Sequence, residues 1–204
     1  MWRSEKLRML RNLQKWLDFE LHDQEQMAVL LPAATEWEFD FAMQELEYKG
    51  SKVYLYGKID RIDASADKAL VTDYKLSENS AKSITDLMKG LDMQMPIYTL
   101  AVEARFEGGK ELLGETYYSI TDGKRVKTAL FASSGNPMLQ NSKSFKQTWD
   151  EFRQQSLTYL KKYITKIYSG DFNVLERCKC NDYCPLKSIC RYEEIAQLGK
   201  EGNE

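Results

Sequence analysis

Residues 53–75 read VYLYGKIDRIDASADKALVTDYK, and this stretch decides the fold. Its two short runs 53–56 and 69–71 are rich in the β-branched and aromatic residues that favour strands. The segment 65–68, Ser-Ala-Asp-Lys, has the composition of a turn. We therefore expect two neighbouring strands that pair as a hairpin.

Two carboxylates and one ammonium converge on this hairpin. Side chains two residues apart on a strand share a face, so Asp73 and Lys75 point the same way, and pairing brings Asp60 beside them. Carboxylates suit Mg²⁺, which keeps several waters and is completed by phosphate oxygens. Lys75 would then position or deprotonate a metal-bound water that attacks a phosphodiester. A surface ion pair between Asp60 and Lys75, which contributes little to stability, is the alternative.

Three polar segments, taken in order, resemble the PD-(D/E)XK nuclease superfamily. They are Gly-x-Ile-Asp-Arg-Ile-Asp from Gly57, Val-x-Asp-Tyr-Lys from Val71 and Gln-x-Pro-Ile-Tyr from Gln94. Within the superfamily the chain is most similar to the RecB-type nuclease domain at the C-terminus of AddB helicase-exonuclease subunits.

The resemblance implies a role for each polar residue of these segments. Asp60 and Asp73 would be metal ligands, Lys75 the catalytic lysine, and Gln94 with Tyr98 an auxiliary motif on the following helix. It also implies Mg²⁺ or Mn²⁺ as cofactor and a restriction-endonuclease-like α/β core, with a mixed central sheet flanked by helices.

The preceding segment offers one further carboxylate. Residues 35–45 alternate between apolar and polar side chains, which predicts a half-buried strand. The run 31–39 resembles the family's pattern ahead of the metal-binding strand, so Glu36 becomes a candidate metal ligand, and Tyr74 is assigned to the same metal site. A solvated strand face explains Glu36 equally well.

The N-terminal residues 2–24 have the periodicity of an amphipathic helix. We expect its apolar face to pack on the core; this face holds Leu7, Leu10, Leu13, Leu17 and Leu21. RecB-like nucleases carry a histidine metal ligand upstream of the first strand, but His22 does not fit that local pattern. An exposed or capping role is the better interpretation of His22.

The rest of the chain predicts further regular elements. Residues 92–106 have helical periodicity, which places Gln94 and Tyr98 on one helix face. Residues 112–120 and 124–131 read as strands around a turn, and a long amphipathic helix is expected to end before Gly170. Residues 133–144 read as a surface loop.

All four cysteines lie close together near the C-terminus. They are Cys178, Cys180, Cys184 and Cys190. Such clustering favours a metal over disulfides, and four thiolates suit either zinc or an iron–sulfur cluster. The resemblance implies a [4Fe-4S] cluster that holds the C-terminal end against the core as a clasp, although the upstream cysteine of the family pattern is missing. A zinc site or free thiols stay open.

Length and composition limit the possibilities. With 204 residues, 43% of them hydrophobic, we expect one core, divided as an N-terminal helix (1–30), a nuclease core (31–175) and a Cys-rich segment (176–204). A net charge of −2 argues against coating nucleic acid by bulk electrostatics. No apolar run approaches the ~20 residues of a membrane span, and no signal peptide is recognisable, so a soluble cytoplasmic protein is expected.

The resemblance implies a metal-dependent DNA exonuclease. The resemblance implies that it acts on linear DNA ends delivered by a helicase domain or subunit, in end processing and recombinational repair. One alternative is a non-catalytic DNA-end-binding or scaffold module with a nuclease-like fold. Another is a cysteine-metal interaction domain whose hairpin charges are incidental.

Overall fold

The computed structural model describes residues 2–26, 30–107, 109–131, 147–172 and 189. The chain divides into two compact units, residues 1–162 and 163–204. The sheet and the candidate site belong to the first unit. The elements are α1 (Trp2–Gln26), β1 (Leu31–Tyr48), β2 (Ser51–Ala64), β3 (Lys68–Lys75), the 3-10 turn η1 (Glu78–Ser80), α2 (Ile84–Met88), α3 (Gln94–Arg105), β4 (Glu111–Ser119), β5 (Lys124–Leu130) and α4 (Trp149–Ser169).

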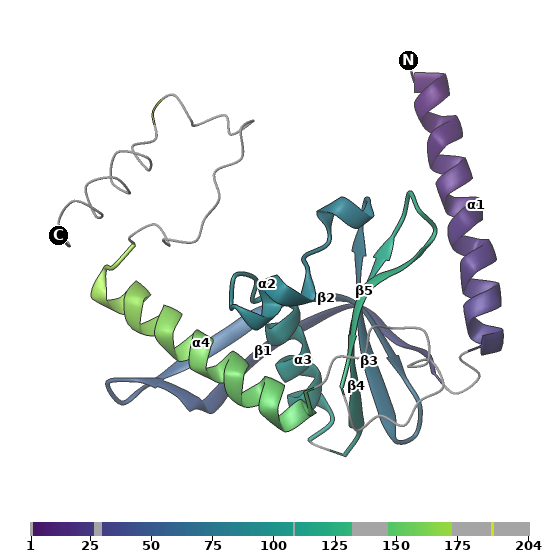
Figure 1. Ribbon diagram of the computed structural model, residues 1–204. Helices are drawn as coiled ribbons and strands as arrows, with labels where there is room; N and C mark the ends of the chain where they lie inside the picture. Colours follow the sequence, from purple (N-terminus) through teal and green to yellow (C-terminus); the bar gives the residue numbers. More distant parts are fainter. Residues whose placement is uncertain (1, 27–29, 108, 132–146, 173–188, 190–204) are drawn as a thin grey trace. The chain divides into compact units, whose positions relative to one another are not determined.

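Within the described residues, five strands form one mixed sheet in the order β1-β2-β3-β4-β5 (Figure 1). Only β3 and β4 are parallel, and the other neighbours run antiparallel. A parallel pair needs a crossover connection, and the segment containing η1, α2 and α3 supplies it. The expected mixed α/β sheet is therefore confirmed for the described residues.

The predicted hairpin is present as β2 and β3. Its ladder runs from the pair Ala64–Ala69 to the pair Arg61–Thr72, and the Ser65 amide donates to the Lys68 carbonyl across the turn at 2.9 Å. The β2–β3 ladder stops at Arg61–Thr72, while β2 continues along β1 as far as Ser51. The next residues beyond the ladder are Asp60 and Asp73, so these two side chains lie where the strands part.

Helix α3 covers one face of the hairpin. Its buried Met95, Ala101 and Val102 pack in the same core cluster as Ile62 and Val71 of the sheet. Pro96 lies in the first turn of the helix, where a missing amide hydrogen is tolerated. This packing fixes the N-terminal turn of α3 beside the end of β3.

Helix α1 is present, but the prediction that its leucines face the core is wrong. The five leucines of that face are 47–60% exposed. The helix instead contacts the sheet through Glu20, which pairs with the buried Arg61, and through Phe19, whose ring centroid lies 4.8 Å from that of Tyr118. The buried guanidinium thus has a second carboxylate, from α1, in addition to Asp63 of its own strand.

Some of the remaining predictions concern described residues, and others concern residues outside them. The turn between β4 and β5 contains Gly123 with φ of 65°, and Gly170 with φ of 73° follows α4, as the sequence predicts. The expected loop 133–144 and all four cysteines lie outside the described residues. No helix in the described part of the chain is both long and apolar enough to span a lipid bilayer.

Candidate active site

Asp60, Asp73 and Lys75 meet where the β2–β3 ladder ends. Asp60 Oδ2 accepts a hydrogen bond of 2.9 Å from the backbone amide of Tyr74, the residue between the other two. Lys75 Nζ lies 2.7 Å from Asp73 Oδ2 and 5.6 Å from the centroid of the Tyr117 ring. The three polar groups that the sequence singles out are therefore neighbours in the structure.

Helix α3 adds a glutamine and a tyrosine to this cluster. Gln94 Oε1 accepts from Lys75 Nζ at 3.1 Å, and Gln94 Nε2 donates to Asp73 Oδ1 at 3.1 Å and to the Tyr98 hydroxyl at 3.0 Å. Gln94 is the first residue of the helix, and its backbone amide donates to Asp92 Oδ1 at 2.8 Å. A single amide side chain thus contacts both Asp73 and Lys75. We call Asp60, Asp73, Lys75, Gln94 and Tyr98 the carboxylate–lysine cluster.

The electrostatics of the cluster favour an added cation. Asp73 is buried, and desolvation raises the pKa of its carboxyl group. The hydrogen bond and charge of Lys75 oppose that rise in pKa, while the negative charges of Asp60 and Asp92 add to it. One ammonium therefore does not offset the carboxylates gathered here.

The donor set fits a hard divalent metal. No group of three or more His, Cys, Asp or Glu side chains arranged to hold a metal occurs among the described residues. Mg²⁺ needs no such group, because one or two carboxylates suffice when water and substrate phosphate supply the other oxygens. The buried Asp73 Oδ2 is ion-paired with Lys75, and burial and the nearby Asp60 and Asp92 carboxylates still raise the pKa of Asp73, so a cation would be favoured beside it. Asp60 and Asp73 are thus the residues that would hold the ion.

Tyr74 and Glu36 lie differently from the other candidates. The Tyr74 hydroxyl accepts from Arg61 Nη1 at 3.2 Å on the opposite face of the sheet, so only the Tyr74 backbone reaches the cluster. Glu36 has φ of 50° and is exposed, and its carboxylate pairs with Lys58 rather than joining Asp73. Its assignment to the metal stays a prediction.

Sequence reasoning missed two acidic residues near the cluster. Asp92 begins the approach to α3 and acts on the pKa of Asp73. Glu115 of β4 is buried beneath α3, where its Oε2 lies 2.8 Å from Thr99 Oγ1. A glutamate inside the apolar run Leu-Leu-Gly-Glu-Thr-Tyr-Tyr was the signal available for the second.

The other face of the hairpin carries a separate ionic network. Arg61 Nε donates to Asp63 Oδ1 at 2.7 Å, and Arg61 Nη1 donates to Glu20 of α1. Thr72 Oγ1 donates to Asp63 Oδ2 at 3.1 Å and accepts from Arg125 Nη1 at 2.9 Å. All of these side chains are largely buried, and we call them the arginine network.

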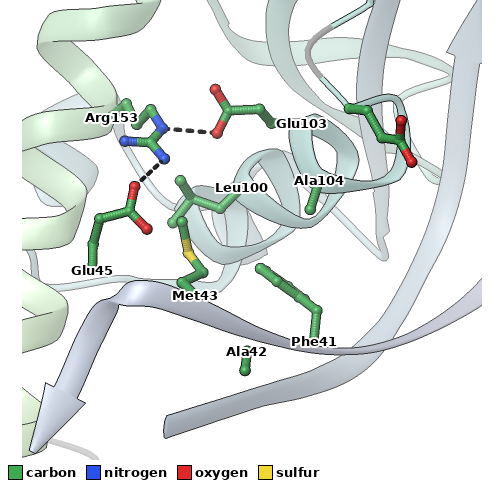
Figure 2. A pocket seen from close by; sticks show the side chains of 9 residues that line it. Phe41, Ala42, Met43, Glu45, Leu100, Glu103, Ala104 and Arg153 are labelled. Carbon is green, nitrogen blue, oxygen red and sulfur yellow. Dashed lines mark hydrogen bonds and ion pairs between the residues drawn. The ribbon is translucent and has the colours of Figure 1, made fainter. Parts of the chain in front are cut away.

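A cavity of about 630 Å³ lies between β1, α3 and α4, apart from the carboxylate–lysine cluster (Figure 2). Arg153 lines the cavity, with its Nε 2.8 Å from Glu103 Oε2 and its Nη2 2.7 Å from Glu45 Oε1. Phe41 and Leu100 contribute apolar side chains to the lining. No member of the cluster lines this cavity, so the candidate active site is the open end of the hairpin.

The chain belongs to the PD-(D/E)XK nuclease superfamily, whose family model matches residues 1–191. It is similar to two curated proteins, each named as the B subunit of an ATP-dependent helicase/deoxyribonuclease. The protein of Limosilactobacillus fermentum (strain NBRC 3956 / LMG 18251) is 40% identical over 97 residues, which cover 46% of this chain and 7% of the relative. That of Lactococcus lactis subsp. cremoris (strain SK11) is 26% identical over 217 aligned positions, covering 83% of this chain and 19% of the relative.

These matches confirm the resemblance that the three polar segments indicate. They also show that the chain corresponds to less than a fifth of each relative's length. A nuclease-type function follows from the family, whereas the reaction and the partners of the whole relatives do not.

Proposed function

We propose that this protein is a metal-dependent deoxyribonuclease that hydrolyses phosphodiester bonds at DNA ends. The observation that supports this best is the carboxylate–lysine cluster, in which Asp60 accepts from the Tyr74 amide, its charge acts on the pKa of Asp73, and Lys75 lies against Asp73. Two acids and one amine at the metal site are what phosphodiester hydrolysis without a histidine base requires.

Each side chain of the carboxylate–lysine cluster would have a distinct role in hydrolysis. A divalent ion bound by Asp60 and Asp73 would supply an acidified water and a positive charge at the phosphate. Lys75 keeps its ammonium directed at the same place, because Asp73 and Gln94 hold it from two sides. From there it orients the attacking water and offsets the charge that develops on the phosphate. Tyr98 fixes Gln94 through the hydrogen bond to its hydroxyl.

The substrate and partner assignments rest on the relatives. Both relatives are named as subunits of an ATP-dependent helicase/deoxyribonuclease. We therefore extend the proposal to exonucleolytic processing of linear DNA ends in recombinational repair, with a helicase domain or subunit as partner and Mg²⁺ or Mn²⁺ as cofactor. A DNA-end-binding module without catalysis is the second candidate function.

The decisive experiment measures release of nucleotides from linear duplex and single-stranded DNA with Mg²⁺ or Mn²⁺. We expect Asp73→Ala and Lys75→Ala to lower the rate at least about a hundredfold. Lys58→Ala is the matched control, since Lys58 is an exposed lysine of the same hairpin that pairs with Glu36. Equal rates in all four proteins would contradict the proposal. Binding of DNA ends by the wild type without cleavage would favour the scaffold alternative.

We also propose that the cysteine-rich segment binds a [4Fe-4S] cluster, with zinc as the alternative metal. The support is the grouping of all four cysteines between positions 178 and 190, which lie outside the described residues. Anaerobically purified protein should contain iron and sulfide and absorb near about 400 nm, as iron–sulfur thiolates do. Stoichiometric zinc without iron would overturn the cluster assignment.

A further inference from the structure

Glu115 is a buried carboxyl group that the proposed mechanism does not use. It is 1% exposed and lies on β4 opposite Val71 of β3, two residues before Asp73. Its Oε2 contacts Thr99 Oγ1 of α3, and its Oε1 has no hydrogen-bond partner within the described residues. An ionised carboxylate in such a place would be costly.

The two short contacts of Thr99 compete for a single hydroxyl proton. Thr99 Oγ1 lies 2.8 Å from the carbonyl oxygen of Met95 and 2.8 Å from Glu115 Oε2. A threonine hydroxyl has one proton to donate, and a carbonyl oxygen can only accept. When Thr99 donates to Met95, the second contact is a hydrogen bond only if Glu115 is the donor. Glu115 must then be a neutral carboxylic acid.

The surroundings of Glu115 favour the same state. Thr99 faces it from α3, Val71 lies beside it on β3 and Ala129 beside it on β5. Burial raises the pKa of Glu115 to about 8, and the nearby carboxylate of Asp92 adds to the rise. A donated hydrogen bond from Thr99 would lower the pKa, but the Met95 carbonyl competes for that proton.

Two further groups complete the charge environment. Tyr117, the next residue on this face of β4, is also buried, and burial raises the pKa of its hydroxyl, with Asp92 and Glu115 adding to that rise. Asp73 lies opposite Tyr117 on β3, with Lys75 following it. The ammonium of Lys75 is engaged by Asp73 and Gln94. Ionised Glu115 would therefore add a negative charge to a face that already holds Asp73 and Asp92.

We propose that Glu115 is a positioning residue that, as a neutral acid, donates to Thr99, ties α3 to β4, and so holds Gln94 against Asp73 and Lys75. Thr99 lies five residues after Gln94 on the same helix. Ionisation of Glu115 reverses this hydrogen bond, so that Thr99 must donate to Glu115 instead of the Met95 carbonyl, and it places a negative charge beneath α3. The cluster then loosens as the pH rises. The effect on cleavage rests on the proposed function, whereas the protonation of Glu115 does not.

The test replaces the acid with its amide. In Glu115→Gln the side-chain NH₂ donates to Thr99 at every pH. Thermal unfolding of both proteins is followed from pH 5 to pH 9. The native state holds the Glu115 proton up to about pH 8, whereas the unfolded chain releases it near 4.5. Native protein binds more protons in this window, so wild-type stability falls as the pH rises. The Tm of Glu115→Gln minus that of the wild type is expected to grow across this range.

Two further variants keep the test decisive. Glu103→Gln removes a carboxylate of the same helix that is ion-paired with Arg153, and its Tm offset should not grow with pH. Thr99→Val removes the acceptor of the neutral acid and also the donor that an ionised Glu115 would use, so its loss of Tm relative to the wild type should be largest above pH 8. If Glu115→Gln folds poorly, Thr99→Val carries the test alone. Parallel pH profiles of wild type and either Glu115→Gln or Thr99→Val would overturn the proposal.

Cleavage assays then connect Glu115 to the site. Between pH 7 and pH 9 the kcat of the wild type should fall about tenfold relative to that of Glu115→Gln. If neither protein cleaves DNA, the proposed function fails, and the unfolding series still decides the state of Glu115. If both cleave with the same alkaline profile, Glu115 does not position Gln94, and that part of the proposal is wrong.

Discussion

On the face of the β2–β3 hairpin that meets α1, the charged side chains are matched one to another. Arg61 contacts Asp63 and Glu20, and both Asp63 oxygens accept hydrogen bonds. Burial lowers the pKa of Arg61, but the hydrogen bond to Glu20 and the charge of Asp63 more than compensate and raise it. The arginine network is therefore held permanently charged.

On the face that meets α3, the same two strands present an unbalanced set. Glu115 Oε1 and the Tyr117 hydroxyl are buried there without a hydrogen bond within the described residues. The pKa of Asp73 is raised by burial, although Lys75 lies beside it. The α1 face is thus held together by paired charges. The α3 face instead keeps buried polar atoms, which is the arrangement expected of a functional site.

Removing a charge from the arginine network, on the α1 face of the hairpin, should have the largest effect on stability. Asp63→Ala removes the carboxylate that both Arg61 and Arg125 contact and leaves Glu20 as the carboxylate beside Arg61, which we expect to lower the free energy of unfolding by about 3–5 kcal/mol. Urea unfolding measures this change. Asp67→Ala, in the exposed turn of the same hairpin, is the control and should shift the midpoint far less. A small effect of Asp63→Ala would contradict the structural role of the network.

Removing a side chain of the carboxylate–lysine cluster, on the α3 face of the hairpin, should lower the reaction rate more than the stability of the fold. Gln94→Ala removes the amide that holds Lys75 and Asp73, and we expect kcat to fall about tenfold with a stability change below about 1 kcal/mol. Gln155→Ala, which removes an amide that contacts the Met88 carbonyl, should leave kcat unchanged. Equal kcat values for Gln94→Ala and the wild type would show that Gln94 does not contribute to the reaction.

Neutralising the functional face should stabilise the protein while it abolishes cleavage. The raised pKa of Asp73 means that its ionised form disfavours folding. Asp73→Asn should therefore raise the free energy of unfolding by about 1 kcal/mol at pH 8. The gain should disappear below pH 3.8, where the unfolded carboxyl is also protonated. Urea unfolding at both pH values checks the sign, and destabilisation at pH 8 would show that the pair with Lys75 dominates.

The smallest effect is expected at the exposed ion pair. Glu36→Gln breaks the contact with Lys58, which is solvent-exposed, so the urea midpoint should not change measurably. We expect kcat to fall less than about threefold, as for other exposed pairs. A loss as large as that of Asp73→Ala would instead place Glu36 at the metal and extend the unbalanced face to β1.

The hairpin and its polar residues could be predicted because their signals are local. Alternation with period two and the turn 65–68 define β2 and β3, and the spacing of Asp73 and Lys75 places them on one face. The position of Gln94 required the family resemblance, since helical periodicity alone does not say which strand the helix covers.

The unpredicted features depend on contacts between distant segments. The leucines of α1 have the pattern of a core face, yet they are exposed, and the helix reaches Arg61 of β2 through Glu20, forty-one positions earlier in the chain. Glu115 is a single acidic residue in an apolar strand, and the sequence of the strand does not reveal its contact with Thr99 of α3. Periodicity reports which side chains are apolar, not which buried charge lies opposite.

The parallel pairing of β3 with β4 has a consequence for how the cluster assembles. The hairpin can form from neighbouring residues, but Gln94 reaches Lys75 only after the whole crossover has closed and β4 has docked. Long-range parallel pairing is slow compared with hairpin formation. A nascent chain would therefore bring Asp60 and Asp73 together early and complete the carboxylate–lysine cluster only after β4 has been synthesised.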